Sequence, residues 1–508
     1  MAAAAPSPPP PSSSSVAPPP AELVAAAARA NQSHLFGDWE QLSEAQRARR
    51  CADVAAVDFS ALAVALSAAL GAEKEGSSPA SSTAARNAGC EPWNRVVSLE
   101  GGTNAEQVAL WEARGLAAAA AGELAVVVLA GGQGTRLGAS GPKGCFDIGL
   151  PCGTSLFGLL ARRVLRLRKR ASAAAGGKDG DGQLARVDLY VMTSAATHDE
   201  TVAHFEANGH YGLGRDGVFF FRQGTMPCVT EEGKVILGPR RAAKAKAAGG
   251  EAAGGTKEEE GEEGEEGGGI AASPDGNGGL YAALVASGAL DRMELRGAKV
   301  VDVVCVDNAL ASPGDPAFVG ACVSRGASVG CRAVSRSRPE EKVGVFARDS
   351  RGRLRVLEYS ELAPEQASAV DDATGRPSFA WANVCMHLFS TGFLRAAAAD
   401  LGCGPGGRAL YHCARKPIPS FSAAKDADVS VPGIKLELFV FDAFDAVPEA
   451  EVLVCGVARE DTFAPVKNAD AAGRDPSSAA VVVGVDTPAA ARAALLARRA
   501  RVGEERGF

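Results

Sequence analysis

A run of glycines directly after an apolar segment is the first feature of this 508-residue sequence that could do chemistry. The segment 124–130 is rich in β-branched residues and leads into Gly131, Gly132, Gly134 and Gly138. Glycine lets the backbone turn sharply or approach a ligand closely, and successive N–H groups can hold a polyphosphate. The spacing matches neither the dinucleotide GxGxxG pattern nor the Walker GK[ST] pattern. The loop therefore predicts a phosphate site of another kind.

Two cations lie on or beside this loop. Arg136 and Lys143 could neutralise bound phosphate, and Pro142 stiffens the segment that precedes Lys143. Either charge alone is more often a solvated surface group. Their position on a glycine-rich loop at the end of a strand favours a role in binding.

Two more blocks place polar residues at the ends of predicted elements. The buried-strand run 300–306 ends at Asp307, whose carboxylate could hold Mg²⁺ against phosphate oxygens or could instead cap a helix. The block 273–281, with the sequence SPDGNGGLY, opens a helical pattern. It is either a simple turn with an N-cap or part of a ligand site.

The elements that must position these groups alternate between strand and helix. A helix is expected to start at Thr154 or Ser155, and helical patterns cover 279–289 and 316–325. This alternation is typical of a mostly parallel α/β sheet, which binds ligands at the carboxyl ends of its strands. Besides 124–130, the predicted strands are 187–192, 218–221, 300–306, 329–334, 343–347, 354–359 and 452–457.

The charge of the chain is concentrated in one segment. The formal net charge is −7, and eight Glu with one Lys between 251 and 266 account for all of it. No basic surface that would follow a nucleic-acid backbone is indicated. The insert 238–269 is expected to be a disordered, solvated loop, with a regulatory or partner-binding role as the alternative.

The remaining composition favours a soluble, cytoplasmic protein. The twelve cysteines are scattered without zinc spacing or CxxC pairs, which indicates a reducing compartment, and no run reaches the ~18 apolar residues of a membrane span. Residues 1–20 hold eight prolines and no charge, which predicts a disordered tail. A chloroplast transit peptide is the alternative; it would be Ser-rich like this tail but also Arg-rich, and the first arginine is Arg29.

Taken together, these blocks resemble one family, the eukaryotic UDP-N-acetylglucosamine pyrophosphorylases. Nine stretches match in the order of the family, over roughly 32–475. They are LAGGQGTRLG (129–138), PKG (142–144), VMTSA (191–195), FRQG (221–224), SPDGNGGLY (273–281), CVDN (305–308), VLEYSE (356–361), GIKLELFVFD (433–442) and PVKNAD (465–470).

The resemblance implies an α/β fold built on a Rossmann-like nucleotidyltransferase domain with a mostly parallel mixed sheet. That catalytic domain is expected over 123–475, after the tail 1–20 and a helical N-terminal appendage over 21–122. Relatives continue into a C-terminal β-rich domain. Residues 476–508 do not resemble it and are expected to form a divergent tail, so that domain is expected to be truncated or absent.

The resemblance also implies the reaction and the residues that serve it. The sugar 1-phosphate would attack the α-phosphorus of UTP with Mg²⁺ (or Mn²⁺) present, which gives UDP-N-acetylglucosamine and pyrophosphate. No protein nucleophile is expected, and the sequence offers no Ser/His/Asp or Cys/His signature. The implied catalytic residues are Arg136, Lys143 and Lys467; the nucleotide-binding residues Leu129, Ala130, Gly131, Gly132, Lys143, Gln223, Gly276 and Asn277; the substrate-binding residues Glu358, Asn383, Lys435 and Lys467; and the metal ligand Asp307.

Two alternatives remain open from the sequence. One is a UDP-sugar pyrophosphorylase that acts on glucose- or galactose-1-phosphate. The other is a catalytically weak paralogue that binds UDP-sugar. The expected partners are UTP and a hexosamine 1-phosphate, with neither nucleic acid nor a membrane, and the oligomeric state is left open.

Overall fold

The protein divides into two compact units in a computed structural model. Unit 1 comprises 1–64, 227–273 and 414–435, and unit 2 comprises 65–226, 274–413 and 436–508. The N-terminal tail up to residue 15, most of the acidic insert and residues 471–484 lie outside the described residues. The structure describes residues 16–73, 87, 89–100, 104–176, 184–240, 267–339, 341–359, 361–372, 374–401, 409–422, 425, 427–470 and 485–506.

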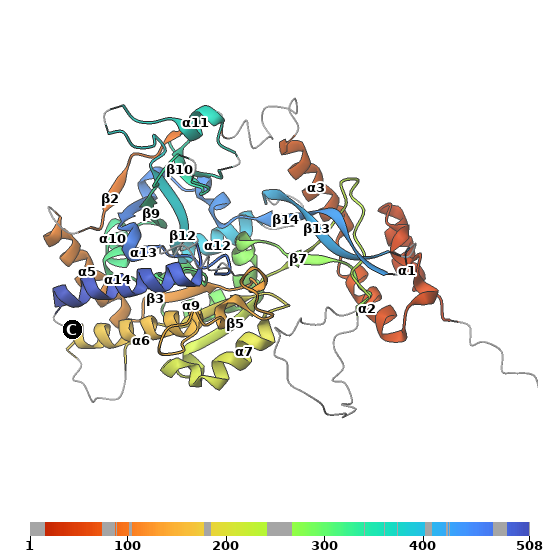
Figure 1. Ribbon diagram of the computed structural model, residues 1–508, viewed down its shortest axis with the longest axis horizontal. Helices are drawn as coiled ribbons and strands as arrows, with labels where there is room; N and C mark the ends of the chain where they lie inside the picture. Colours follow the sequence, from red (N-terminus) through yellow and green to blue (C-terminus); the bar gives the residue numbers. More distant parts are fainter. Residues whose placement is uncertain are drawn as a thin grey trace, which may run out of the picture. The chain divides into compact units, whose positions relative to one another are not determined.

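Unit 2 is built on an eleven-stranded mixed sheet (Figure 1). Its main path runs β2-β15-β9-β12-β8-β3-β4-β5, and the pairings are parallel except at β12, which is antiparallel to both neighbours. The predicted mostly parallel α/β sheet is therefore confirmed. The strands are β1 (Glu91–Pro92), β2 (Val96–Ser98), β3 (Leu124–Leu129), β4 (Leu189–Thr193), β5 (Val218–Arg222), β8 (Val300–Cys305), β9 (Val329–Ser335), β10 (Val345–Arg348), β11 (Leu354–Leu357), β12 (Trp381–Ser390) and β15 (Val452–Val457).

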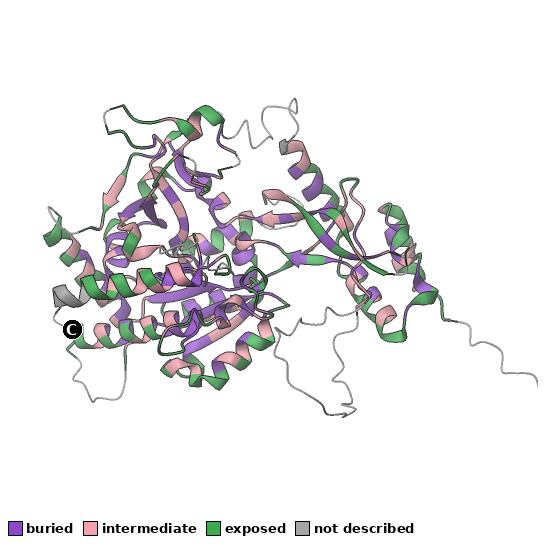
Figure 2. Ribbon diagram, in the orientation of Figure 1, coloured by how far each residue is buried: buried purple, intermediate pink, exposed green. Residues whose placement is uncertain are grey.

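The central strands are apolar on both sides because helices cover both faces of the sheet. All six residues of β3 are buried, which explains its unbroken apolar sequence. Figure 2 shows these buried strands in purple between helices with exposed outer faces. One face packs against α5 (Ala105–Ala120), α6 (Leu156–Ala174) and α10 (Pro316–Arg325), and the other against α8 (Leu280–Ala286), α9 (Ala289–Leu295) and α12 (Thr391–Asp400).

Local signals account for the starts of two of these helices. The Ser155 hydroxyl accepts a hydrogen bond from the Gly158 N–H, so α6 begins where the sequence predicts. In α10 the Asp315 carboxylate accepts from the Phe318 N–H and Pro316 occupies the first turn. The sequence analysis did not predict β12, α7 (His198–Ala207), α12 or α14 (Pro488–Arg506).

Unit 1 joins three separate segments around a small core. Its helices are α1 (Ala21–Arg29), α2 (Glu44–Ala55) and the first part of α3 (Phe59–Glu73). The buried Arg50 guanidinium donates to the backbone oxygens of Leu35 and Gly268, 2.5 and 2.6 Å away, and so ties the first segment to the second. The strands β13 (Tyr411–Ser422) and β14 (Ala427–Leu438) form a two-stranded sheet that supplies the third segment, and β6 (Thr225–Pro227) pairs with β7 (Ala272–Pro274).

No described helix is by itself both long and apolar enough to span a membrane. The helices Glu44–Ala55 and Phe59–Gly71 reach the length and apolar composition of a span only when they are taken together, and they meet at a bend of 65°.

Candidate active site

Most of the predicted site residues lie where parallel strands of unit 2 end. β3 runs into the glycine loop, β8 into Asp307 and β5 into Gln223. Because β3 pairs in parallel with β8 and with β4, which pairs with β5, these ends lie on one edge of the sheet. This is the edge at which open α/β sheets bind their ligands.

The glycine loop folds back on itself after β3. The Lys143 N–H donates to the Gly132 oxygen at 3.0 Å, and the Gly134 N–H donates to the Gly141 oxygen at 2.9 Å. Gly138 has a φ of 76°, a conformation that other residues rarely adopt. The fold of the loop therefore returns Lys143 to its start, beside the buried Leu129 and Ala130.

Lys143 and Asp307 form a pair between this loop and the end of β8. The Lys143 ammonium lies 3.6 Å from the Asp307 carboxylate, and both side chains remain partly exposed, at 19% and 24%. The next helix after Asp307 starts at Pro316 and is capped by Asp315. The helix-capping interpretation of Asp307 is therefore wrong, and its carboxylate is available for a ligand.

A second group of predicted residues meets around Gln223. A β-carbon added to Gly131 would lie 2.0 Å from the Gln223 amide oxygen, so any larger residue there would displace the Gln223 side chain. The Gln223 amide donates to the Asp275 carboxylate at 3.1 Å and to the Gly276 oxygen at 3.0 Å. Burial raises the pKa of Asp275, although its hydrogen bond with Gln223 opposes this shift.

Asn277 makes long-range contacts instead of capping the helix that follows it. Its side-chain oxygen accepts from the Val440 N–H at 2.9 Å, and its amide nitrogen lies 3.7 Å from the Cys385 sulfur. Gly276 has a φ of 91°, and a β-carbon there would lie 2.4 Å from the Leu438 oxygen. The block 273–281 is therefore more than a turn with an N-cap, because it is held against residues far away in sequence.

The two predicted hexosamine-binding residues flank Gly344. The Asn383 N–H donates to the Gly344 oxygen at 2.8 Å, and a β-carbon on Gly344 would lie 2.9 Å from the Glu358 carboxylate. Burial, reinforced by the charge of Glu361, raises the pKa of Glu358 to about 7. Glu358 thus titrates close to neutral pH.

Lys467 lies on a loop that contacts both sides of the site. The Val466 N–H donates to the Asp307 oxygen at 2.8 Å, and the Ala469 N–H donates to the Arg136 oxygen at 3.1 Å. The Lys467 ammonium lies 3.9 Å from the Asp486 carboxylate. The loop therefore connects the end of β8, the glycine loop and the segment that leads into α14.

The two remaining predicted cations differ from Lys143 and Lys467. The Arg136 side chain is exposed, and its guanidinium has no ion-pair or hydrogen-bond partner in the described part of the chain. Lys435 lies on β14 within unit 1, where its charge acts on the buried Cys228 thiol. Lys435 therefore belongs to unit 1, whereas the other predicted site residues belong to unit 2.

Several groups beside these residues were not predicted from the sequence. Asp486 contacts Lys467, while Glu361, His412 and Asp442 lie close to Glu358. Glu361 and Asp442 stand inside motifs quoted above, VLEYSE and GIKLELFVFD, so the motifs could have suggested them. His412 and Asp486 lie outside every quoted motif, and no pattern in the sequence indicated a role for them.

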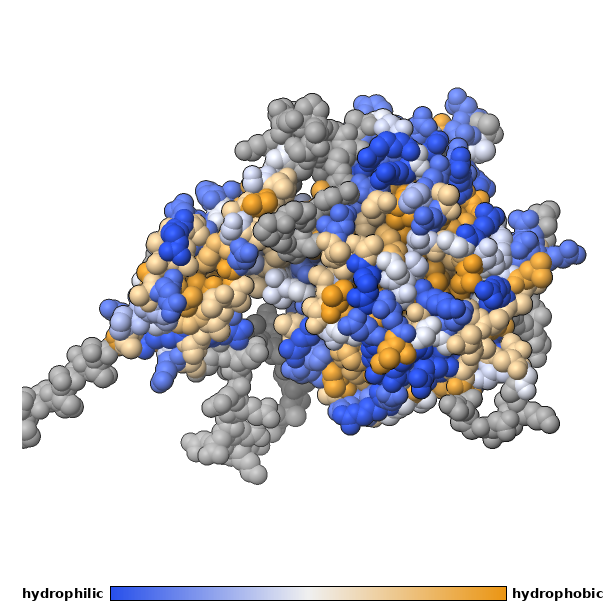
Figure 3. Space-filling model, turned by 180° about the vertical axis from the view of Figure 1, so that it is seen from behind, coloured by the Kyte–Doolittle hydropathy of each residue, from blue (hydrophilic) through white to orange (hydrophobic). Residues whose placement is uncertain are grey.

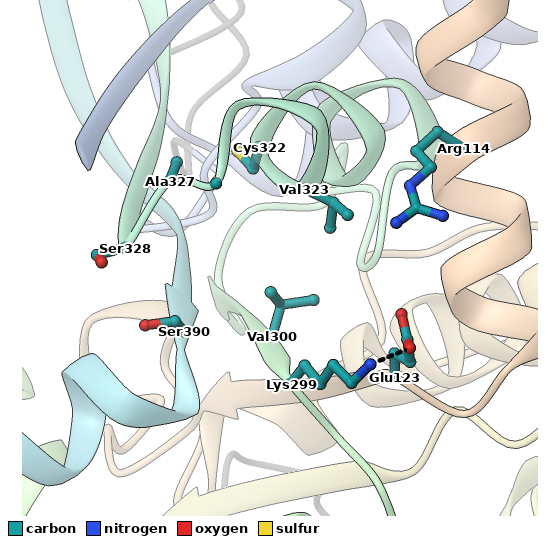
Figure 4. Close-up of a pocket in the computed structure, with 10 residues that line it drawn as sticks. Arg114, Glu123, Lys299, Val300, Cys322, Val323, Ala327, Ser328 and Ser390 are labelled. Atoms are coloured by element: carbon teal, nitrogen blue, oxygen red, sulfur yellow. Dashed lines mark hydrogen bonds and ion pairs between the residues drawn. The ribbon is translucent and has the colours of Figure 1, made fainter. Parts of the chain in front are cut away.

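A cavity of about 270 Å³ lies elsewhere in unit 2 (Figure 4). Arg114 and the Lys299–Glu123 pair line it together with apolar groups such as Val323. Lys299 and Val300 stand where β8 begins, one strand length of about 20 Å from the end that carries Asp307. The cavity contains none of the predicted site residues and is a separate feature.

Comparison with known proteins identifies the relatives of this chain. Residues 84–249 and 262–395 match the family model described as UTP–glucose-1-phosphate uridylyltransferase. The chain is 39% identical to UDP-N-acetylglucosamine diphosphorylase 1 of Arabidopsis thaliana over 394 residues, which cover 77% of this chain and 70% of that protein. It is 34% identical to the human UDP-N-acetylhexosamine pyrophosphorylase-like protein 1 over 479 residues, with 93% and 83% covered.

Solved structures give the same result. The UDP-N-acetylglucosamine pyrophosphorylase of Trypanosoma brucei, solved with an inhibitor, superimposes with a TM-score of 0.72 at 32% identity and covers 94% of this chain and 84% of its own. The family resemblance noted in the sequence is thereby confirmed. The chain belongs to the UDP-N-acetylglucosamine pyrophosphorylases, within the wider UDP-sugar pyrophosphorylase family.

Proposed function

We propose that this protein is a uridylyltransferase that makes UDP-N-acetylglucosamine and pyrophosphate from UTP and N-acetylglucosamine-1-phosphate. The observation that carries the proposal is the Lys143–Asp307 pair, which stands between the glycine loop and the end of β8. It combines a cation and a carboxylate at the edge of the sheet where a nucleoside triphosphate would bind. The names of the relatives supply the substrate class.

The reaction needs no covalent intermediate with the protein. A phosphate oxygen of the sugar 1-phosphate forms a new bond to the α-phosphorus of UTP, and the bond from that phosphorus to the bridging oxygen breaks. Pyrophosphate leaves with those bonding electrons. The protein then acts by positioning the two substrates and by neutralising negative charge as it moves to the leaving group.

We propose that different residues bind the base and the phosphates of UTP. Gln223 and Gly276 are hydrogen-bonded to each other and Asn277 to Val440, and these three residues would contact the uracil base and its ribose. Arg136 and Lys143 would face the triphosphate from that loop. Leu129, Ala130, Gly131 and Gly132 would provide close backbone contact, which a bulkier sequence would block.

The sugar phosphate would lie between the remaining predicted residues. Glu358 and Asn383, which flank Gly344, would accept and donate hydrogen bonds to the hexosamine. Lys467 would face a phosphate from the loop next to Asp307. We assign Lys435 the same kind of role, on the family resemblance alone.

Asp307 fits a divalent cation by the chemistry of its donor. It offers a partly exposed carboxylate oxygen at the end of a buried strand, and Mg²⁺ prefers one or two carboxylates together with substrate phosphates and water. We propose that Asp307 holds Mg²⁺ or Mn²⁺. The ion would supply charge neutralisation for the phosphates, while Lys143 restrains the carboxylate between turnovers.

We also propose that the enzyme works in the cytoplasm. The eleven cysteines in the described part of the chain are all free thiols, as in a reducing compartment. On this proposal, UTP and a hexosamine 1-phosphate are its partners.

A panel of sugar phosphates tests the proposal directly. The full-length protein is incubated with UTP, Mg²⁺ and one sugar 1-phosphate at a time, and pyrophosphate release is measured together with the UDP-sugar formed. We expect turnover of N-acetylglucosamine-1-phosphate that stops when the metal is chelated. Turnover of glucose- or galactose-1-phosphate without the N-acetylated sugar would contradict the proposed substrate, and no turnover of any sugar would contradict the proposed activity.

A further inference from the structure

A cluster of three carboxylates and one imidazole lies beside the predicted sugar site. Glu358 and Glu361 follow β11, His412 stands on β13 and Asp442 lies in the 3-10 helix Val440–Ala446, which follows β14. The side chains of Glu361, His412 and Asp442 are 17%, 20% and 11% exposed. Glu358 has an expected role in binding, and the other three groups have none so far.

His412 lies between two carboxylates of this cluster. Its Nε2 atom is 3.0 Å from an Asp442 oxygen, and its Nδ1 atom is 3.7 Å from a Glu361 oxygen. A neutral imidazole has only one N–H, so it would present a lone pair to one of the two carboxylates. The geometry therefore favours the imidazolium, which has an N–H on each side.

Asp442 fixes the orientation of the imidazole. An Asp442 oxygen accepts from the Phe439 N–H at 3.2 Å, which anchors the carboxylate. The Phe439 ring covers the His412 ring at a centroid distance of 4.3 Å. The ring of His412 is thus held by its partner at one edge and by an aromatic face.

Glu361 transmits this position to Glu358. One Glu361 oxygen accepts from the Glu358 N–H at 3.1 Å and from the Asn87 side chain at 3.3 Å. The Glu361 N–H in turn donates to the Glu358 backbone oxygen at 2.9 Å. The Glu361 side chain therefore closes the turn that presents Glu358.

Charge is the second link between these groups. The ionisable groups that face Glu358 are Glu361, His412, Asp442 and the Cys385 thiol. The pKa of Glu358 is raised to about 7 overall, mainly by burial. Of the four groups only His412 acts in the opposite direction, because its positive charge favours the ionised carboxylate. Burial disfavours a charged His412, but the hydrogen bond and charge of Asp442, with the charges of Glu361 and Glu358, outweigh it and raise the pKa of His412.

We propose that His412, oriented by Asp442, is a positioning residue for the sugar phosphate. As an imidazolium it holds Glu361, which closes the turn that presents Glu358, and it keeps the Glu358 carboxylate ionised to accept hydrogen bonds from the hydroxyl or amide hydrogens of a hexosamine. This inference rests on the proposed function, since the ligand is the sugar 1-phosphate of that reaction.

The variant His412→Gln tests the proposal in steady-state kinetics from pH 6 to 8.5. In the unmodified enzyme, KM for the sugar phosphate should fall as the pH rises through about 7, because Glu358 loses its proton there. In the variant, KM at pH 7 should rise about tenfold, as expected for the loss of one charge-assisted contact, and the fall should move to higher pH. KM for UTP and kcat at saturating sugar phosphate should stay within about twofold, since the contact is remote from the reacting phosphates.

Two matched variants separate this role from general damage. Asp442→Asn keeps a polar partner for His412 without its charge, and it should shift the pH profile by less than His412→Gln, because it also removes a charge that raises the pKa of Glu358. His210→Asn changes a histidine outside the cluster at a φ of 50°, which Asn tolerates, and should leave the profile unchanged. An increase in KM of equal size at every pH would show a merely structural role and overturn the proposal, as would no change at all.

A measurement on the unmodified protein guards against a variant that fails to fold. The chain contains six histidines, so their imidazole nitrogens can be assigned by NMR. We expect both nitrogens of His412 to carry protons at pH 7, and a neutral ring would overturn the proposal. If the unmodified enzyme turns over no sugar phosphate, the proposed function fails and this inference fails with it. If the enzyme is active but the pH profile of His412→Gln is unchanged, the inference fails and the proposed function stands.

Discussion

Arg136 and Lys143 belong to the same loop but have different surroundings. Lys143 already has a carboxylate partner in Asp307, whereas the exposed Arg136 guanidinium has no partner among the described residues. An exposed cation contributes little to folding stability. Arg136 is therefore expected to act almost entirely on bound phosphate.

The substitution Arg136→Ala separates catalysis from stability. We expect kcat/KM to fall by about a hundredfold or more, the scale for removal of one group that neutralises charge in the transition state. The free energy of unfolding should change by less than about 0.5 kcal/mol, as for most surface substitutions. Enzyme kinetics and urea unfolding measure the two effects on the same preparation.

A matched arginine provides the control for this prediction. Arg215 is also exposed and lies outside the site, and among the described residues it pairs only with Glu206, at 3.5 Å. Arg215→Ala should alter neither activity nor stability appreciably. Loss of the folded state in Arg136→Ala, or activity equal to that of Arg215→Ala, would show that Arg136 does not act on phosphate.

At the residue scale, the sequence could predict those site residues that stand on recognisable motifs next to strands. Glycines after an apolar run and an acid at a strand end are local signals, and the structure brings Gly131 to Gln223 and Lys143 to Asp307. His412 could not be predicted. Its role depends on carboxylates from two other elements, and the distance between such groups is set by the tertiary fold.

At the scale of elements, the C-terminal segment is ordered around a helix. Helix α14 packs within unit 2, where Arg498 donates to the Leu310 oxygen at 3.0 Å and to the Ser312 hydroxyl at 2.9 Å. Ahead of it, the Asp486 backbone oxygen accepts from the N–H groups of Lys467 and Asn468 at 2.8 and 3.0 Å. The segment therefore holds the loop that carries a predicted catalytic lysine.

Substitutions at Asp486 distinguish its carboxylate from its backbone. Asp486 has a φ of 60°, a conformation that Asn tolerates and Ala adopts only at a cost of about 1 kcal/mol. Asp486→Asn should keep the thermal midpoint and lower kcat several-fold, because the Lys467 ammonium loses its charged partner. Asp486→Ala should lower both quantities. An unchanged kcat in Asp486→Asn would show that the carboxylate does not position Lys467.

Helices α5 and α10 cross so closely that they depend on glycine. A β-carbon on Gly115 would lie 2.0 Å from the Pro316 oxygen, and one on Gly320 would lie 1.8 Å from the Trp111 oxygen. Gly115→Ala should therefore lower the free energy of unfolding by about 1–3 kcal/mol, the usual cost of overpacking. Urea unfolding measures this change. Gly392→Ala in α12, where no atom lies within 4 Å of the added carbon, should cause no loss.

At the scale of the whole molecule, the apolar runs of the sequence predicted the strands of the large sheet. They did not predict how distant segments of the chain group into units. Eight apolar runs were expected to be strands, and all correspond to strands of the large sheet. Six of them pair in parallel and are largely buried, which leaves a continuous apolar signature, whereas β10 and β11 pair antiparallel with each other. β12 escaped prediction because polar residues such as Asn383 and His387 interrupt its apolar sequence. Unit 1 assembles three distant segments through contacts such as Arg50 with Gly268, which local sequence does not reveal.

One segment of the sequence sets the net charge of the chain. On the face in Figure 3, apolar residues lie among polar ones. Residues 241–266 contain eight Glu against four Lys or Arg, so their removal would change the formal net charge from −7 to −3. The backbone on either side of this segment is joined within unit 1, where the Gly268 N–H donates to the Pro239 oxygen and the Gly238 N–H donates to the Gly269 oxygen, both at 2.9 Å.

Replacement of residues 241–266 by a four-residue Gly/Ser linker should therefore leave the fold and the uridylyltransferase activity intact. The described ends are already close, since a β-carbon on Gly267 would lie 2.2 Å from the Pro239 oxygen. A shorter loop loses less entropy on folding, so stability should rise by about 1–2 kcal/mol. Thermal unfolding checks the fold and its stability, kinetics check the activity, and isoelectric focusing checks the change in net charge. A large loss of kcat in a variant that remains folded would show that the acidic segment contributes to catalysis and is more than a solvated loop.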